Sequence, residues 1–165
     1  NSNSAIIVTI DGKTYGSKVL DGMKFQREIE KRTYKLGNGK VPVQRFADYK
    51  KDTSTEKLGQ IKPSVQSPYT LANLRGIYPR EIEEMIIEAI ESMGEKIKGF
   101  NDDDAILSAA ETRSSSPIRM LRDENNKSLG INYLYVIGEG SGYSGGIVSS
   151  AIDGIKTAQF ILEKE

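Results

Sequence analysis

The stretch "VIGEGSGYSGGIVSS", residues 136 to 150, holds five glycines within nine residues, at positions 138, 140, 142, 145 and 146. It follows an apolar run, Tyr133 to Ile137, that has the composition of a β-strand. From 146 to 164, apolar residues recur at the spacing of one helix face. We therefore expect a strand, a glycine-rich turn and a C-terminal helix. That helix would be apolar at Ile147, Val148, Ala151, Ile152, Ile155, Ala158 and Leu162.

The pattern Gly140-x-Gly142-x-x-Gly145 has the spacing of a dinucleotide-binding fingerprint. Such a fingerprint also needs a second parallel strand with an acidic residue about 20 positions further on, and the sequence ends at Glu165. Two interpretations remain open. The glycines and the first N–H groups of the helix let an anionic ligand approach closely, with Glu139 accepting a hydrogen bond from a ligand hydroxyl. Alternatively, the stretch is a plain tight connection.

Composition limits the classes of partner. The chain of 165 residues carries 23 basic and 23 acidic residues, so no net field would attract it to nucleic acid or to an anionic membrane. No apolar run approaches the roughly 20 residues that a membrane helix needs, and no signal-peptide pattern is present. We expect a soluble, cytoplasmic protein without nucleic-acid or membrane partners.

The sequence contains neither Cys nor His. This excludes Ser/His/Asp and Cys/His nucleophilic sites, thiolate or imidazole zinc sites and histidine-ligated haem. No metal site is expected. Any acid–base chemistry would have to use Asp, Glu, Lys or Tyr side chains, or a bound cofactor.

The remaining patterns predict an α+β fold, with a mostly antiparallel sheet packed by helices in one compact unit over residues 1–165. Strand-like runs lie at 5–10, 105–121 and 131–139, and a helix is expected within 21–39. A second helix begins at Pro79 and carries an apolar stripe expected in the core. Residues 40–69 are polar and irregular. The members of the stripe are Ile82, Met85, Ile86, Ala89, Ile90, Met93 and Ile97.

A second polar motif, "ETRSSSPIR", spans residues 111 to 119. Its Arg113 and the three serines before Pro117 have the donors that an anion site requires. The same residues would also suit a polar connection between two strands. Both interpretations of Arg113, Ser114, Ser115 and Ser116 remain open on the residues alone.

The two motifs together resemble a known family. The strings "ETRSSSPIRMLRD" (111–123) and "LYVIGEGSGYSGGIVSSAIDGIKTA" (134–158) are similar to the C-terminal part of a family of large FAD-dependent dehydrogenases. In that family, E-T-R-[ST]-S-S-P precedes G-E-G-[AS]-G-Y-[AS]-G-G-I-x-S-[AS]-A-x-D-G in the same order. Upstream segments such as "GMKFQREIEKRTY" and "VPVQRFADY" also resemble the family, so the similarity spans nearly the whole chain.

The resemblance implies a split FAD site. Such flavoproteins bind FAD with an N-terminal fingerprint and complete the flavin site with a strand and helix from the end of the chain. Glu139 would lie near ribityl or phosphate oxygens, and Tyr143 and the serines 114–116 near the flavin ring or the substrate, with Arg113 as a further contact. The implied cofactor-binding residues are Gly138, Glu139, Gly140, Gly142, Tyr143, Gly145, Gly146 and Ile147.

The chain departs from this family in lacking an N-terminal fingerprint, and it begins without Met. We therefore expect a piece of a longer polypeptide. Residues 1–110 would be the substrate-side part, and 111–165 the C-terminal segment of the FAD-binding domain. The partner would be the N-terminal FAD-binding half of the same polypeptide, together with an unidentified small-molecule substrate. The chain alone would be inactive and would not retain FAD. The alternative is a non-enzymatic module that binds a phosphate-bearing ligand or a partner.

Overall fold

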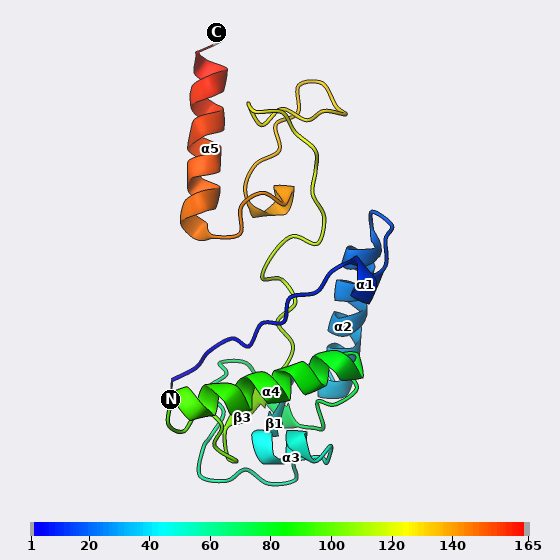
Figure 1. Cartoon of the computed structure of the whole chain (residues 1–165), viewed down its shortest axis with the longest axis vertical. Helices are drawn as coiled ribbons and strands as arrows, with labels where there is room; N and C mark the ends of the chain where they lie inside the picture. The colour runs from blue at the N-terminus through cyan, green and yellow to red at the C-terminus, as the bar shows by residue number, and fades with distance from the viewer. Residues whose placement is uncertain (1, 164–165) are drawn as a thin grey trace. The chain divides into compact units, whose positions relative to one another are not determined.

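The computed structural model describes residues 2–163, which group into two compact units (Figure 1). Unit 1 comprises the residues up to Asp11 together with Arg27–Ala110. Unit 2 comprises Gly12–Gln26 and the residues from Glu111 onward. The sequence pattern predicts one compact unit with a functional division near residue 110, and the structure assigns the residues on either side of that position to different units. Helix α2 (Asp21–Gly37) contributes its first residues to unit 2 and the rest to unit 1.

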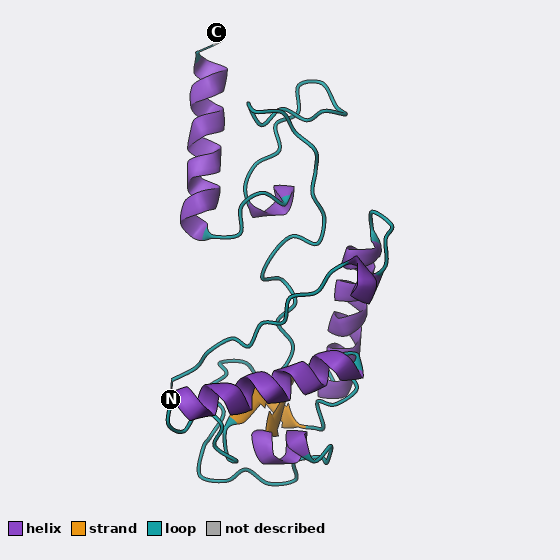
Figure 2. Cartoon of the chain, viewed as in Figure 1, coloured by secondary structure: helices purple, strands orange, loops and turns teal. Residues whose placement is uncertain are grey.

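Unit 1 is built on a small mixed sheet with the strand order β2-β1-β3. Its strands are drawn in orange in Figure 2. Strand β1 (Val41–Arg45) pairs in parallel with β2 (Tyr69–Leu71) and antiparallel with β3 (Ile106–Ser108). The α+β class is confirmed, but the prediction of a mostly antiparallel sheet is wrong. Parallel strands need a crossover of a dozen or more residues, and the long segment between β1 and β2 provides it.

The centre of unit 1 lies in a segment that the sequence pattern predicts as irregular. Within residues 40–69, β1 leads directly into helix α3 (Phe46–Lys50). Val43 and Phe46 are fully buried, and Tyr49 is nearly so. The prediction of an irregular 40–69 segment is therefore wrong over its first third. The strand has only five residues and contains Pro42, so it offers too little period-2 pattern to recognise.

The second predicted helix is confirmed as α4 (Arg80–Lys96), with Pro79 immediately before it as the N-cap residue. Its apolar stripe is only partly in the core. Ile82 and Ile90 are buried, whereas Met85 and Met93 are exposed. Glu83 lies on the buried face beside the isoleucines.

Unit 2 contains helices and turns but no strand within its described residues. Its elements are α1 (Gly12–Tyr15), the start of α2, a 3-10 helix at Glu139–Ser141 and α5 (Ile147–Leu162). The predicted strand over Tyr133–Ile137 does not form. Tyr133 has a left-handed φ of 60°, which interrupts an extended chain, and Tyr135 makes only an isolated bridge to Lys127.

The predicted C-terminal helix is confirmed as α5, but its apolar face is largely exposed. Ile147 is 93% exposed, and Val148, Ile155 and Leu162 are also exposed. The predicted strand at 5–10 does not form, because these residues have no regular secondary structure and pair with no strand of the sheet. Within residues 2–163, none of the helices has the length and apolar character needed to cross a bilayer.

Candidate functional site

The glycine-rich segment of unit 2 follows a defined path. Gly138 has a φ of 73°, which side-chain-bearing residues rarely adopt, and it opens the 3-10 turn. The Ser141 side chain is buried, and its Oγ donates to the carbonyl of Gly138 at 2.6 Å. Gly142, with a φ of 82°, closes the turn and donates its N–H to the carbonyl of Glu139 at 3.0 Å. The turn is thus held by its own hydrogen bonds.

The structure brings the serine motif against this turn. Ser116 Oγ lies 3.4 Å from the carbonyl oxygen of Gly140, and the Met120 N–H donates to the carbonyl of Ser141 at 3.0 Å. Arg119 Nε donates to the carbonyl of Gly142 at 3.1 Å. The two motifs that the sequence singles out are therefore neighbours in space. The other predicted contacts in the serine motif, Arg113, Ser114 and Ser115, are exposed.

Tyr143 carries the one aromatic ring within the glycine-rich segment. The guanidinium carbons of Arg119 and Arg122 lie 4.8 and 4.1 Å from its ring centroid. These distances are typical of cation–π contacts. Tyr143 remains 40% exposed, so its ring is oriented by two arginines and still accessible.

An ion pair that the sequence analysis missed anchors the segment. Arg122 and Asp153 form two hydrogen bonds, and their side chains are only 10% and 12% exposed. The Asp153 carboxylate also accepts the Gly138 N–H at 2.9 Å. Hydrogen bonding from Arg122, followed by that from Gly138, holds the pKa of Asp153 below its ordinary value.

Asn126 completes this cluster. Its side-chain nitrogen lies 3.1 Å from Asp153 and 2.6 Å from Thr157 Oγ1, and Thr157 is buried one helical turn after Asp153. The sequence motif could have indicated one member of this cluster, Asp153. Asp153 belongs to the A-x-D-G end of the family motif, whereas the apolar residues of α5 predict only the helix.

The remaining predicted residues form an exposed edge of the site. Glu139 is exposed, and its carboxylate makes no hydrogen bond or ion pair with any residue in the described part of the chain. The Gly146 N–H donates to Ser149 Oγ at 3.1 Å, which caps α5. The N–H groups of Ile147 and Val148 lie in the first turn, where no helical acceptor precedes them. Backbone donors, a carboxylate and an aromatic ring are therefore gathered in one segment. This combination can bind and orient a polar, partly anionic ligand.

Comparison with known proteins identifies the family. Residues 1–114 match the family described as "FAD-dependent protein, C-terminal domain-like", and the chain belongs to that family. The matched region ends shortly after Ala110, where unit 1 ends. The glycine-rich segment lies outside the matched region.

The chain is also similar to an uncharacterized protein of Clostridium beijerinckii, with 43% identity over 167 residues. This similarity includes the glycine-rich segment, because it covers 99% of the chain. The chain spans 31% of that relative's length.

Proposed function

We propose that the chain is the C-terminal domain of an FAD-dependent oxidoreductase of the dehydrogenase type, and that residues 138–147 line its flavin site. The observation that carries the proposal concerns Gly140 and Gly145. A Cβ placed on either glycine would meet no atom within 4 Å, and neither has a positive φ. The fold therefore does not require glycine at these positions, and within this glycine-rich turn both leave the backbone open to close approach of a ligand.

Gly142 provides the contrast. A Cβ there would lie 2.3 Å from the carbonyl oxygen of Ile118 and 2.9 Å from Cα of Arg119. Packing inside unit 2, together with its left-handed φ, accounts for this glycine. The segment thus combines glycines that the fold requires with glycines that it does not.

The exposed groups suit FAD. The first N–H groups of α5 suit phosphate or carbonyl oxygens, Glu139 suits ribityl hydroxyls, and Tyr143 offers an aromatic face. Bound FAD would supply the hydride-transfer chemistry. The protein would hold and orient the cofactor, with Arg122 and Asp153 keeping the start of the turn in place.

Unit 1 would lie on the substrate side, and an N-terminal region of the whole protein would be the partner that binds the ADP part of FAD. Most of the affinity in a split site of this kind comes from pyrophosphate contacts in the fingerprint region. The 165-residue chain alone is therefore expected neither to retain FAD nor to turn over a substrate.

Purification of the whole protein tests the proposal. A yellow protein with flavin absorbance that releases FAD on denaturation is the expected result. A colourless whole protein that cannot be reconstituted with FAD would instead favour a non-enzymatic module for a phosphate-bearing ligand or a protein partner. For the isolated chain, fluorescence titration with FAD should show no micromolar binding.

A further inference from the structure

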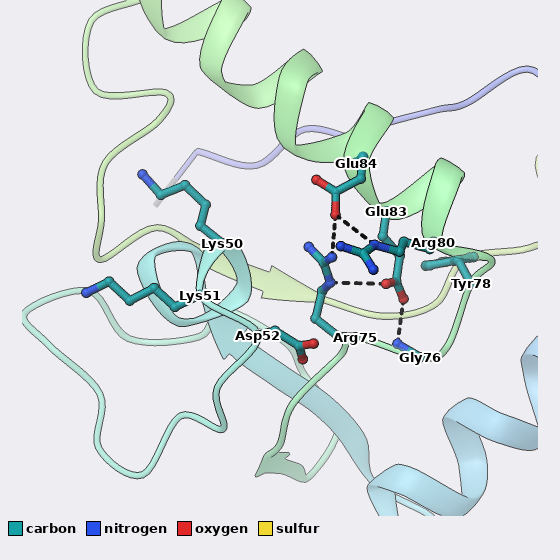
Figure 3. Close-up of a pocket in the computed structure, with 9 residues that line it drawn as sticks. All are labelled: Lys50, Lys51, Asp52, Arg75, Gly76, Tyr78, Arg80, Glu83 and Glu84. Carbon is teal, nitrogen blue, oxygen red and sulfur yellow. Dashed lines mark hydrogen bonds and ion pairs between the residues drawn. The ribbon is translucent and has the colours of Figure 1, made fainter.

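Unit 1 contains a cavity of about 560 Å³ that is separate from the glycine-rich segment (Figure 3). Its lining comes from the end of α3, the loop after β2 and the first turn of α4. The cavity is strongly polar, with four basic and three acidic side chains. The lining residues are Lys50, Lys51, Asp52, Arg75, Gly76, Tyr78, Arg80, Glu83 and Glu84.

Arg75 is a fixed cation in this cavity. Its side chain is 9% exposed, and its Nε lies 3.1 Å from an oxygen of Glu83, whose side chain is 5% exposed. The Gly76 N–H donates to the other oxygen of Glu83 at 2.6 Å. Arg75 also lies over the buried ring of Tyr49. Glu83 therefore serves as the buried counter-ion of Arg75.

Glu84 is bound differently. One of its oxygens lies 2.5 Å from Nη2 of Arg75 and 3.9 Å from Nε of Arg80. Figure 3 shows both guanidinium groups converging on this carboxylate. The Glu84 side chain is 47% exposed and that of Arg80 is 88% exposed. The Arg80–Glu84 pair is exposed and contributes only about 0–1 kcal/mol to stability. Glu84 can reach solvent, whereas Glu83 is buried against Arg75.

We propose that this cavity binds a small molecule bearing a carboxylate, and that the ligand's carboxylate replaces that of Glu84 between Arg75 and Arg80. The geometry already present is that of a carboxylate held by two guanidinium groups, for which arginine is the preferred partner. Release of Glu84 toward solvent would leave Arg75 paired with Glu83, and the ligand's carboxylate would take over the contact that Glu84 makes. The proposal does not depend on the flavin proposal, since all its residues belong to unit 1.

Asp52 and Lys51 extend the site. In Figure 3 the Asp52 carboxylate lies on the Arg75 side of the pocket and both lysine side chains extend away from it, and its Oδ1 accepts a hydrogen bond from Asn73 at 2.8 Å. Lys50 is already engaged by Glu91 at 2.9 Å and Asp103 at 3.2 Å. The Lys51 side chain is exposed and has no ion pair or hydrogen bond with a residue in the described part of the chain. A ligand with a second polar group would find Asp52 or Lys51 available.

Titration of the whole protein with succinate tests the site, with the uncharged analogue succinamide as the ligand control. Calorimetry or NMR shifts should show binding of succinate and none of succinamide. Glu84→Gln should tighten succinate binding by roughly fivefold, because it removes the carboxylate that competes for the two arginines. Arg80→Gln should weaken it by a similar factor.

The matched controls are Glu81→Gln, an exposed acid in the same helical turn, and Arg27→Gln, an exposed arginine of unit 1. Both should bind succinate as the unmodified protein does. Arg75 itself is a poor target, because its loss would leave Glu83 buried and unpaired. The proposal is overturned if succinate fails to bind, if Glu84→Gln and Glu81→Gln behave alike, or if inorganic phosphate binds more tightly than succinate.

Discussion

Arg122 Nη1 lies 2.7 Å from Asp153 Oδ2, and Nη2 lies 2.9 Å from Oδ1, so the two side chains form a bidentate pair between a loop and α5. The same Nη1 donates to the carbonyl of Val136 at 2.6 Å, and Asp153 accepts the N–H of Gly138. The pair therefore connects the helix after the glycine-rich turn with the chain that enters it. We infer that it sets the position of the proposed flavin-contacting backbone.

Asp153→Asn should destabilise unit 2. Removing one partner of a mostly buried ion pair leaves the other charge uncompensated, which costs about 3–5 kcal/mol. Chemical denaturation measured by circular dichroism would report this loss. Lys156→Gln, an exposed charge on the same helix, should change the unfolding free energy little. If both variants unfold at the same denaturant concentration, the pair does not anchor the turn.

The same pair predicts a pH dependence. The folded-state pKa of Asp153 lies below its ordinary value of 3.8, chiefly because Arg122 hydrogen-bonds its charged form. Its contribution to stability is therefore fully present above pH 3.8 and is lost as pH falls through the lowered pKa. Melting temperatures measured across this acid range should fall more steeply for the unmodified protein than for Asp153→Asn. Parallel curves would rule out a contribution from this carboxylate.

Gly142→Ala should damage the fold of unit 2 whether or not a ligand is present. The new Cβ would overlap the carbonyl oxygen of Ile118 and would occupy a backbone with φ of 82°. Backbone strain of this kind alone costs about 1–3 kcal/mol. The thermal midpoint of the flavin-free protein is the relevant measurement. An unchanged midpoint would show that the segment relaxes easily.

Glu139→Ala tests the proposed polar contact to the cofactor. Because the Glu139 carboxylate has no partner among residues 2–163, its loss should leave stability unchanged. Loss of a charge-assisted bond costs about 1.5–3 kcal/mol, so FAD affinity of the whole protein should fall roughly ten- to a hundred-fold. Glu124→Ala, an exposed acid outside the turn, provides the control. Equal affinities for the two variants would remove Glu139 from the site.

The helices were predictable because α2, α4 and α5 carry periodic apolar residues over 16 or 17 positions. The sheet was not predictable from the sequence, because β2 and β3 have three residues each and β1 contains a proline. Pairing between such short strands depends on tertiary contacts rather than on local pattern.

The candidate site, like the fold, was only partly predictable from the sequence. The glycine and serine motifs were recognisable as strings, and the structure shows that Ser116 and Gly140 are neighbours. Arg122 and Asp153 are 31 positions apart, and their pairing could not be inferred from spacing. Glu83 lies in the first turn of α4, and its burial beside Arg75 depends on the loop that precedes the helix rather than on local pattern.

The most direct test of the account is the FAD content of the whole protein carrying Gly145→Val, compared with Gly130→Val. A Cβ at either glycine would meet no atom within 4 Å, and neither glycine has a positive φ, so both variants should fold normally. Gly145→Val should lose FAD while its circular dichroism and melting temperature stay unchanged, and Gly130→Val should keep FAD. Full FAD occupancy in a folded Gly145→Val protein would contradict the claim that this segment lines the flavin site.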